Sequence, residues 1–340
     1  MKPSVFDIAS HSTRNPEKAN NGDYCSWEIL EEDQQLLAVL SDGVGSSPCD
    51  WKASKLACTQ FINQFKKHTN IADLLLRIEA ALVKTNKEIL LEPEPCSGMK
   101  STLSLLVWDL NVESCFFVNI GDSRIYEYKG HILSQISQDE TKSVILKNKD
   151  GKPMIISGTA VVAEGITNAM GSHELSISVQ SKPVKSSKGF LLSSDGFHNC
   201  KNSFVKDATK IFGALDMQKA LDELQISYRD AQKDDMTLLA VRLYNQTSNS
   251  KNIIKAILDK TDTSQWDKLE ITKAILEEME VSIRERNEQN AKILLNYCDD
   301  HYIDLGRENL GNLASLIVQT DFQAGEIYRD ILNKMRLSRH

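Results

Sequence analysis

Short apolar runs that end at acidic turns recur along the first two thirds of the chain. The clearest run spans 36–40 and is followed by Ser-Asp-Gly-Val-Gly, with the acid at Asp42. An unbroken apolar run of this length between polar turns predicts a buried strand. The run 190–193 leads in the same way to Asp195, and the run Val-Asn-Ile leads to Gly and Asp122. Acidic side chains therefore mark the ends of several predicted strands.

Two further acids precede strands instead of following them. Asp234 comes just before an apolar run that begins at Met236, and Asp23 precedes a strand-like stretch after Asn-Gly. A single Asp-Gly pair is most simply a hairpin turn. The repetition of acids at strand edges favours a different interpretation, in which the strands converge and their acids share one pocket.

Helical and strand patterns occur in blocks along this part of the chain. Apolar residues recur at helical spacing in 51–67, 71–91, 203–212 and 217–232. Strand patterns are found at 4–9, 25–30, 36–40, 101–108, 115–120, 124–128, 131–136, 174–180, 190–193 and 236–243. The consecutive strands of 101–136 are separated only by turns, which predicts an antiparallel meander. This order predicts the α+β class, with sheets packed together and helices outside, because a doubly wound fold alternates strands and helices.

The character of the sequence changes after residue 244. Residues 245–251 are polar and predict a linker, and the chain beyond them carries only helical periodicity. We therefore predict a first domain at 1–244, a linker at 245–251 and an all-helical module of about four or five helices at 252–340.

Charge, hydropathy and cysteine content argue against several classes of protein. The net charge of -7 gives no electrostatic footprint for nucleic acid or an anionic membrane. No apolar run approaches the ~18 residues of a membrane helix, and the first residues lack the apolar core of a signal peptide. The seven cysteines are an odd number without a C-x-x-C pair, which argues against a disulfide framework and against zinc. A reduced, cytoplasmic location is the simplest inference.

The acids themselves predict hard-metal chemistry. Carboxylates without cysteine or histidine neighbours select Mg²⁺, Mn²⁺ or Ca²⁺. Two such ions about 3.5–4 Å apart clamp an oxyanion and lower the pKa of a bridging water, so the natural reaction is phosphate-ester hydrolysis by in-line attack of that water. The sequence contains no nucleophile elbow, Walker loop or H-E-x-x-H motif. It also lacks a D-x-D-x-D-G loop, so calcium storage fits poorly.

Six short motifs stand in a fixed order along 1–244. They are Asn21-Gly22-Asp23, Asp42-Gly43-Val44-Gly45-Ser46, Ser101-Thr102, Asn119-Ile120-Gly121-Asp122-Ser123-Arg124, Ser194-Asp195-Gly196 and Asp234-Asp235-Met236-Thr237. Each is weak alone, but in this order the chain resembles the metal-dependent protein phosphatases of type 2C, the PPM family of serine/threonine phosphatases, in its bacterial form. The resemblance covers roughly Met1 to Tyr244.

This resemblance implies a four-layer α/β/β/α sandwich with a centre for two Mn²⁺ or Mg²⁺ ions at one end. By the family pattern, Asp42 bridges both ions and the Gly43 carbonyl binds one of them. Asp23 binds directly or through water, and Asp195 and Asp234 hold the second ion. A weaker third ion is implied at Asp122. An arginine of the first loop contacts the substrate phosphate in this family. Arg14 is the candidate, although its distance from Asn21 is longer than the usual pattern.

The chain departs from the family pattern at several positions. Val44 stands where many members carry a histidine, a proposed general acid that other bacterial-type members also lack. Gly22 replaces the usual acid and Ser46 a glycine. The usual Asp-His-Ser is replaced by Asp139-Glu140-Thr141. These changes would adjust the activity of the site and leave the predicted metal ligands in place.

The sequence thus predicts a cytoplasmic, metal-dependent phosphatase that acts on phosphoserine and phosphothreonine of proteins, in partnership with a serine/threonine kinase or its targets. The helical module would dock a partner, regulate access or dimerise. The main alternative is a catalytically inactive relative that binds phosphoproteins. Hydrolysis of a small phosphate ester or nucleotide is a further alternative.

Overall fold

The structure is a computed structural model, and it describes residues 5–129, 132–145, 148, 152–156, 159–184, 187–214, 217–244, 253–264, 266–284, 286–319 and 325–337. The predicted linker 245–251 lies outside these residues. The described chain divides into two compact units, one spanning Phe6–Leu243 and the other containing the helices that follow residue 252. No helix among the described residues is both long enough and apolar enough to cross a membrane.

Two five-stranded antiparallel sheets form the centre of the first unit. In the first sheet the strands follow the order β12 (Gln180–Pro183), β5 (Ser114–Ile120), β4 (Leu103–Asp109), β3 (Gln35–Asp42) and β2 (Asp23–Leu30). In the second they follow the order β1 (Val5–Thr13), β14 (Met236–Tyr244), β13 (Gly189–Ser193), β6 (Arg124–Lys129) and β7 (Ile132–Gln135). The strand pairs β2–β3, β3–β4, β4–β5, β5–β12, β6–β7, β6–β13 and β13–β14 are all antiparallel. The meander predicted for 101–136 is not continuous, because β4 and β5 pair in the first sheet whereas β6 and β7 pair in the second.

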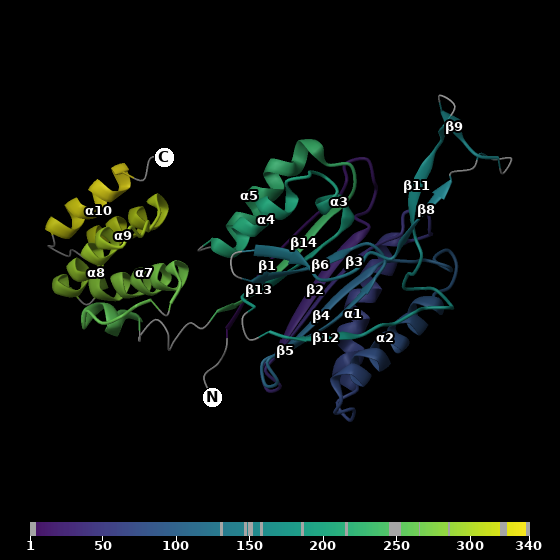
Figure 1. The fold of residues 1–340 in the computed structure, drawn as a ribbon, viewed down its shortest axis with the longest axis horizontal. Coiled ribbons are helices and arrows are strands. Elements are labelled where there is room, and N and C mark those ends of the chain that lie inside the picture. Colours follow the sequence, from purple (N-terminus) through teal and green to yellow (C-terminus); the bar gives the residue numbers. More distant parts are fainter. Residues whose placement is uncertain are drawn as a thin grey trace. The chain divides into compact units, whose positions relative to one another are not determined.

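Helices cover the outer face of each sheet, which gives the four layers visible in Figure 1. The first sheet is covered by α1 (Asp50–Lys67) and α2 (Leu74–Leu90). The second sheet is covered by α3 (Asp195–His198), α4 (Phe204–Gly213) and α5 (Met217–Tyr228), which is followed by the 3-10 turn η1 (Arg229–Ala231). The predicted α/β/β/α sandwich is confirmed.

Three apolar clusters fill the spaces between these layers. One lies between the first sheet and α1 and α2, and another between the second sheet and α4 and α5. The third joins the facing sides of the two sheets and includes Trp108, whose ring packs edge-on against Phe190 at 4.9 Å between centroids. Alternation along β3 explains this division, because Leu37 and Val39 face the helices while Leu36 and Leu40 face the other sheet.

The segment 174–180 is a correction to the sequence prediction. Only Gln180 of this segment belongs to a strand, β12, and the preceding residues have no strand partner. The alternating pattern is nevertheless real, because Leu175, Ile177 and Val179 pack against the cluster below the first sheet. The alternating pattern therefore indicated correctly that one side of the segment is buried. It did not indicate that the segment lacks a neighbouring strand to hydrogen-bond with.

A pair of small two-stranded sheets extends away from the sandwich (Figure 1). In one, β8 (Thr141–Ile145) pairs with β11 (Val162–Ile166), and in the other β9 (Ile155–Ile156) pairs with β10 (Thr159–Ala160).

The second unit is helical throughout its described residues. Residues 253–258 form a helix and are followed by α7 (Lys268–Arg284), α8 (Glu288–Asp300), α9 (Arg307–Gln319) and α10 (Gly325–Leu337). Its apolar cluster is built from residues 253–331, with partly buried side chains up to Met335 packed against it.

Candidate metal centre

The first sheet places two acids opposite each other at one of its ends. Asp23 is the first residue of β2 and Asp42 the last of β3, and the antiparallel register pairs them directly. Thr102 holds the Asp42 backbone from both sides: its hydroxyl accepts a hydrogen bond from the Asp42 N–H at 2.9 Å, and its own N–H donates to the Asp42 carbonyl at 2.7 Å. The Thr102 hydroxyl also lies 2.8 Å from that of Ser123. The position of Asp42 is therefore fixed by its neighbours as well as by the sheet.

The second sheet contributes acids from two adjacent strands. Asp195 is the first residue of α3 and stands two residues after β13, and Asp234 stands two residues before β14. Ser194 and Thr237 tie these strand ends together. The Ser194 N–H donates to the Thr237 carbonyl at 3.1 Å, and the Thr237 N–H donates to the Ser194 hydroxyl at 3.0 Å. Asp195 and Asp234 are consequently held at the same end of their sheet.

Asp235 connects the two sheets. Its side chain is only 1% exposed, and its carboxylate accepts hydrogen bonds from the N–H groups of Asn15 at 2.7 Å and Gly22 at 2.8 Å. These donors belong to the loop that leads into β2, so a residue of the second sheet fixes the approach to Asp23. This acceptor role agrees with Asp235 being a structural residue of the turn.

The buried acids carry a large electrostatic cost. Burial raises the pKa of Asp42 well above its usual range, and the charges of Asp23 and Asp195 raise it further. Burial likewise raises the pKa of Asp23 to about 7. The pKa of Asp195 is raised by burial and then by the charge of Asp234. These mutual effects show that acids from both sheets lie in one electrostatic cluster.

Several oxygen atoms of this cluster are unsatisfied. Among the described residues, both carboxylate oxygens of Asp23 and the Oδ1 atom of Asp195 are buried without a hydrogen-bond partner. Buried polar atoms are normally paired, and buried charges normally coordinate a metal or an opposite charge. The donor set of carboxylate oxygens therefore fits a hard divalent cation such as Mn²⁺ or Mg²⁺.

The side chains are not arranged around an ion as they stand. In the part of the chain that the structure describes, no group of three His, Cys, Asp or Glu side chains is already placed to hold a metal. An ion at this end of the sheets would require carboxylates to turn toward it, while the backbone positions of the acids stay as the strands set them.

The other predicted site residues differ in their surroundings. Asp122 follows β5, and its pKa is raised to about 6 by burial and by the charge of Asp195, which places it within the field of the cluster. The Gly43 N–H donates to the Gly22 carbonyl at 3.0 Å. Arg14 is exposed, and its guanidinium donates to the backbone carbonyls of Lys18 and of Ala19 in its own loop.

Steric crowding explains why position 22 is a glycine and not the acid of the family pattern. A Cβ atom there would lie 3.0 Å from Oδ2 of Asp235 and 3.3 Å from Oδ2 of Asp50. The larger acid that the family pattern has at this position would therefore not fit without displacing one of them. Asp50, the first residue of α1, brings a carboxylate to this place that sequence reasoning did not assign to the site.

Lys18 is the other residue that sequence reasoning missed. Its ammonium nitrogen lies 2.5 Å from Oδ1 of Asp234 and 2.9 Å from Oδ2 of Asp235. A single lysine in a polar loop carries no sequence signal for such a contact, because its partners follow more than 210 positions later.

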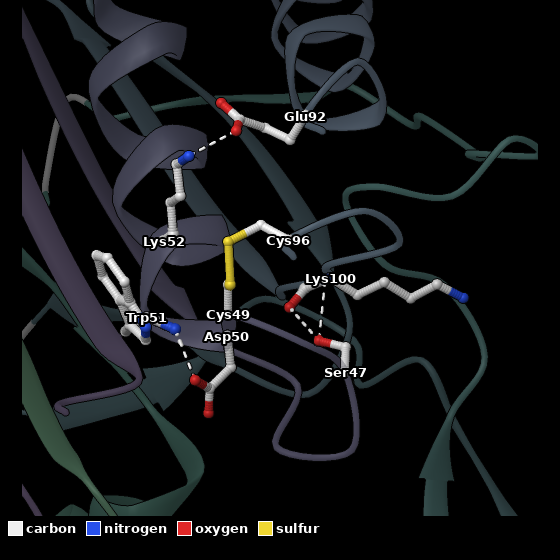
Figure 2. Close-up of a disulfide and its surroundings, with 8 residues drawn as sticks. All are labelled: Ser47, Cys49, Asp50, Trp51, Lys52, Glu92, Cys96 and Lys100. Carbon is white, nitrogen blue, oxygen red and sulfur yellow. Dashed lines mark hydrogen bonds and ion pairs between the residues drawn. A yellow bond between two sulfur atoms is a disulfide. The ribbon is translucent and has the colours of Figure 1, made fainter. Parts of the chain in front are cut away.

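A disulfide holds the loop that follows Asp42, which corrects the inference of fully reduced cysteines that their odd number and spacing suggested. Cys49 and Cys96 are bonded across 47 positions of sequence and join the start of α1 to the loop after α2 (Figure 2). Ser47 and Lys100 strengthen the same connection, because the Lys100 N–H donates to the Ser47 hydroxyl at 3.0 Å. The spacing of the cysteines gave no indication of this pair, which is created by the packing of α1 against α2. The other five cysteines are free.

Comparison with known proteins agrees with the order of these motifs. The profile of the family described as Protein phosphatase 2C matches residues 10–236, and the chain belongs to this family. A curated relative, the serine/threonine protein phosphatase PstP of Mycobacterium tuberculosis, is 26% identical over 254 residues, which are 72% of this chain and 47% of PstP. The chain thus spans about half the length of the curated relatives it matches.

Solved structures show the same fold. The crystal structure of the Mycobacterium tuberculosis serine/threonine phosphatase PstP/Ppp covers 71% of this chain and 100% of its own, with a TM-score of 0.54 and 21% identity. The catalytic domain of PstP in complex with two manganese ions covers the same shares, with a TM-score of 0.52 and 19% identity.

Proposed function

We propose that this chain is a metal-dependent protein serine/threonine phosphatase that hydrolyses phosphoserine and phosphothreonine. The observation that carries the proposal is the buried acid cluster at the end of the two sheets, in which Asp23 and Asp195 have carboxylate oxygens without a partner. Such a cluster needs a cation, and a phosphoprotein-binding module without catalysis has no need for it. The family membership and the manganese bound by the PstP domain support the same conclusion.

Within this proposal each acid has a role. Asp42 would hold both ions, Asp23 and the Gly43 carbonyl would complete the first site, and Asp195 and Asp234 would hold the second. Asp122 would bind a weaker third ion. Two divalent ions, when bound, would lower the pKa of a water molecule and neutralise charge on the phosphate.

The protein itself would contribute by holding the acids in position and by keeping water away from them. Thr102 fixes the backbone of Asp42 through two hydrogen bonds, so this acid has little freedom to move away from the reaction centre. Burial of Asp23 excludes water from its carboxylate and would strengthen its interaction with a cation, while Asp42 beside it is half-buried. Arg14 lies at the exposed edge and would bind the substrate phosphate after leaving the carbonyls of its own loop.

Partners and location belong to the same proposal. The substrates would be phosphorylated proteins, with a serine/threonine kinase or its targets as partners, and the helical unit would serve docking or dimerisation. Five free cysteines support a cytoplasmic location. The Cys49–Cys96 disulfide counts against it, because cytoplasmic thiols are normally kept reduced.

The experiment is a p-nitrophenyl phosphate and phosphopeptide assay with and without Mn²⁺. We expect wild-type turnover to require the metal and Asp42→Asn to lose at least about a hundredfold of it, because a shared ligand is removed. Asp73→Asn is the matched control, since Asp73 caps α2 away from the cluster and asparagine caps a helix equally well. If the wild type shows no metal-dependent turnover on either substrate, the phosphatase proposal is wrong and the inactive, phosphoprotein-binding alternative replaces it.

A further inference from the structure

We propose that Lys18 is a tethered cation that competes with metal ions for the acid cluster and thereby sets its metal affinity. This inference rests on the proposed metal-dependent function. Its basis is the position of the ammonium group, 2.5 Å from Oδ1 of Asp234 and 2.9 Å from Oδ2 of Asp235.

The two carboxylates that hold Lys18 are not equivalent. Asp235 is 1% exposed and is already committed to the N–H groups of Asn15 and Gly22. The Asp234 side chain is 48% exposed, and its Oδ1 atom accepts hydrogen bonds from Lys18 and, at 2.7 Å, from the Asp235 N–H. Lys18 therefore shares a carboxylate that an ion at the second sheet would use, and it holds one of the two oxygens.

The loop aims Lys18 at this place. Arg14 donates to the Lys18 carbonyl and so holds the backbone of the loop at the lysine. The Asn15 side chain donates to the Lys233 carbonyl at 2.9 Å, which attaches the same loop to the segment just before Asp234. The ammonium group donates to both Asp234 and Asp235, so the two carboxylates hold it in this position.

The Lys18 ammonium group and a divalent ion would compete because both are positively charged and both would contact Asp234. A divalent ion bound by Asp195 and Asp234 would be repelled by an ammonium that shares one of these carboxylates. Metal binding would therefore require Lys18 to swing away, and the 32% exposure of its side chain leaves it a route to solvent. Without metal, the same ammonium offsets part of the repulsion among the acids and keeps the cluster folded.

The experiment measures Mn²⁺ binding to the full-length protein by calorimetry, after removal of metal with a chelator. Lys18→Met keeps the length of the side chain and removes its charge, and we expect Mn²⁺ to bind at least about tenfold more tightly. Lys18→Arg keeps the charge and should bind Mn²⁺ like the wild type. Lys52→Met is the matched control, because Lys52 forms a similar ion pair of 2.5 Å with Glu92 away from the acids, and its Mn²⁺ affinity should not change.

A second measurement separates competition from a purely structural role. In chelator, the melting temperature of Lys18→Met should be lower than that of the wild type, and saturating Mn²⁺ should remove the difference. If Lys18→Met binds Mn²⁺ with unchanged or weaker affinity while the wild type binds it, the lysine only orders its loop and this inference is wrong. If neither protein binds Mn²⁺, the proposed function fails as well. If Lys18→Met is poorly folded in chelator, Lys18→Gln gives the same comparison.

Discussion

Replacement of Gly196 by alanine tests the contact that brings together the two segments of the second sheet that carry Asp195 and Asp234. A Cβ atom at this position would lie 1.9 Å from the backbone oxygen of Asp235 and 3.4 Å from Cβ of Asp234. Neither neighbour is the end of a flexible side chain, so the turn after β13 and the segment before β14 would have to move apart. Because Asp195 precedes Gly196 directly, the substitution would separate Asp195 from Asp234.

The size of the effect follows from this overlap. Inserting a methyl group into tightly packed surroundings costs about 1–3 kcal/mol of unfolding free energy. For a unit of this length we expect the melting temperature to fall by about 2–12 °C. Metal affinity should fall by at least about tenfold, since displaced supporting groups weaken metal sites by roughly 10–100-fold.

The assay compares Gly196→Ala with Gly213→Ala by thermal melting in chelator and by Mn²⁺ calorimetry. Gly213 ends α4, and a Cβ atom there meets no other atom within 4 Å, so this variant should melt like the wild type and bind Mn²⁺ equally well. If Gly196→Ala matches Gly213→Ala in both measurements, the two segments are not in the contact described above and the reasoning is refuted.

Three other predictions concern the sandwich and its boundary. The pKa of buried His198 is lowered to about 3 by burial and by Arg124, so the folded state binds its proton less tightly than the unfolded state. The protein should therefore lose about 2 kcal/mol between pH 8 and pH 5 through this group, and His198→Phe should show a smaller loss in denaturant titrations at the two pH values. Reduction of Cys49–Cys96 should cost up to about 4 kcal/mol, given a closed loop of 47 positions. Dithiothreitol should thus lower the melting temperature of the wild type but not of Cys49→Ser. Finally, a protein lacking Ser250 to His340 should melt cooperatively, because the apolar clusters of the sandwich use residues before 244 only; an insoluble product would contradict this boundary.

Sequence patterns predicted the strand ends well and the contacts around them poorly. Asp42 and Asp195 were expected at the ends of buried runs, and they end β3 and follow β13, because local periodicity reports burial directly. The ion pairs of Lys18 and the Cys49–Cys96 bond join segments far apart in the chain, and periodicity carries no information about such pairs. The roles assigned to the acids remain proposals, since they depend on ions as well as on position.

The pairing of Asp23 with Asp42 depends on the exposed hairpin turn at 31–34. This turn joins β2 to β3 at the opposite end of the ladder, roughly 24 Å away at about 3.4 Å per residue. Because neighbouring side chains on a strand point to opposite faces, one residue inserted in the turn would shift the alignment and turn one acid away from the other, unless a bulge absorbed it. The number of residues in the turn therefore sets whether Asp23 and Asp42 face each other at the far end of the ladder. We expect the turn to accept a change of residue type more readily than a change in its length.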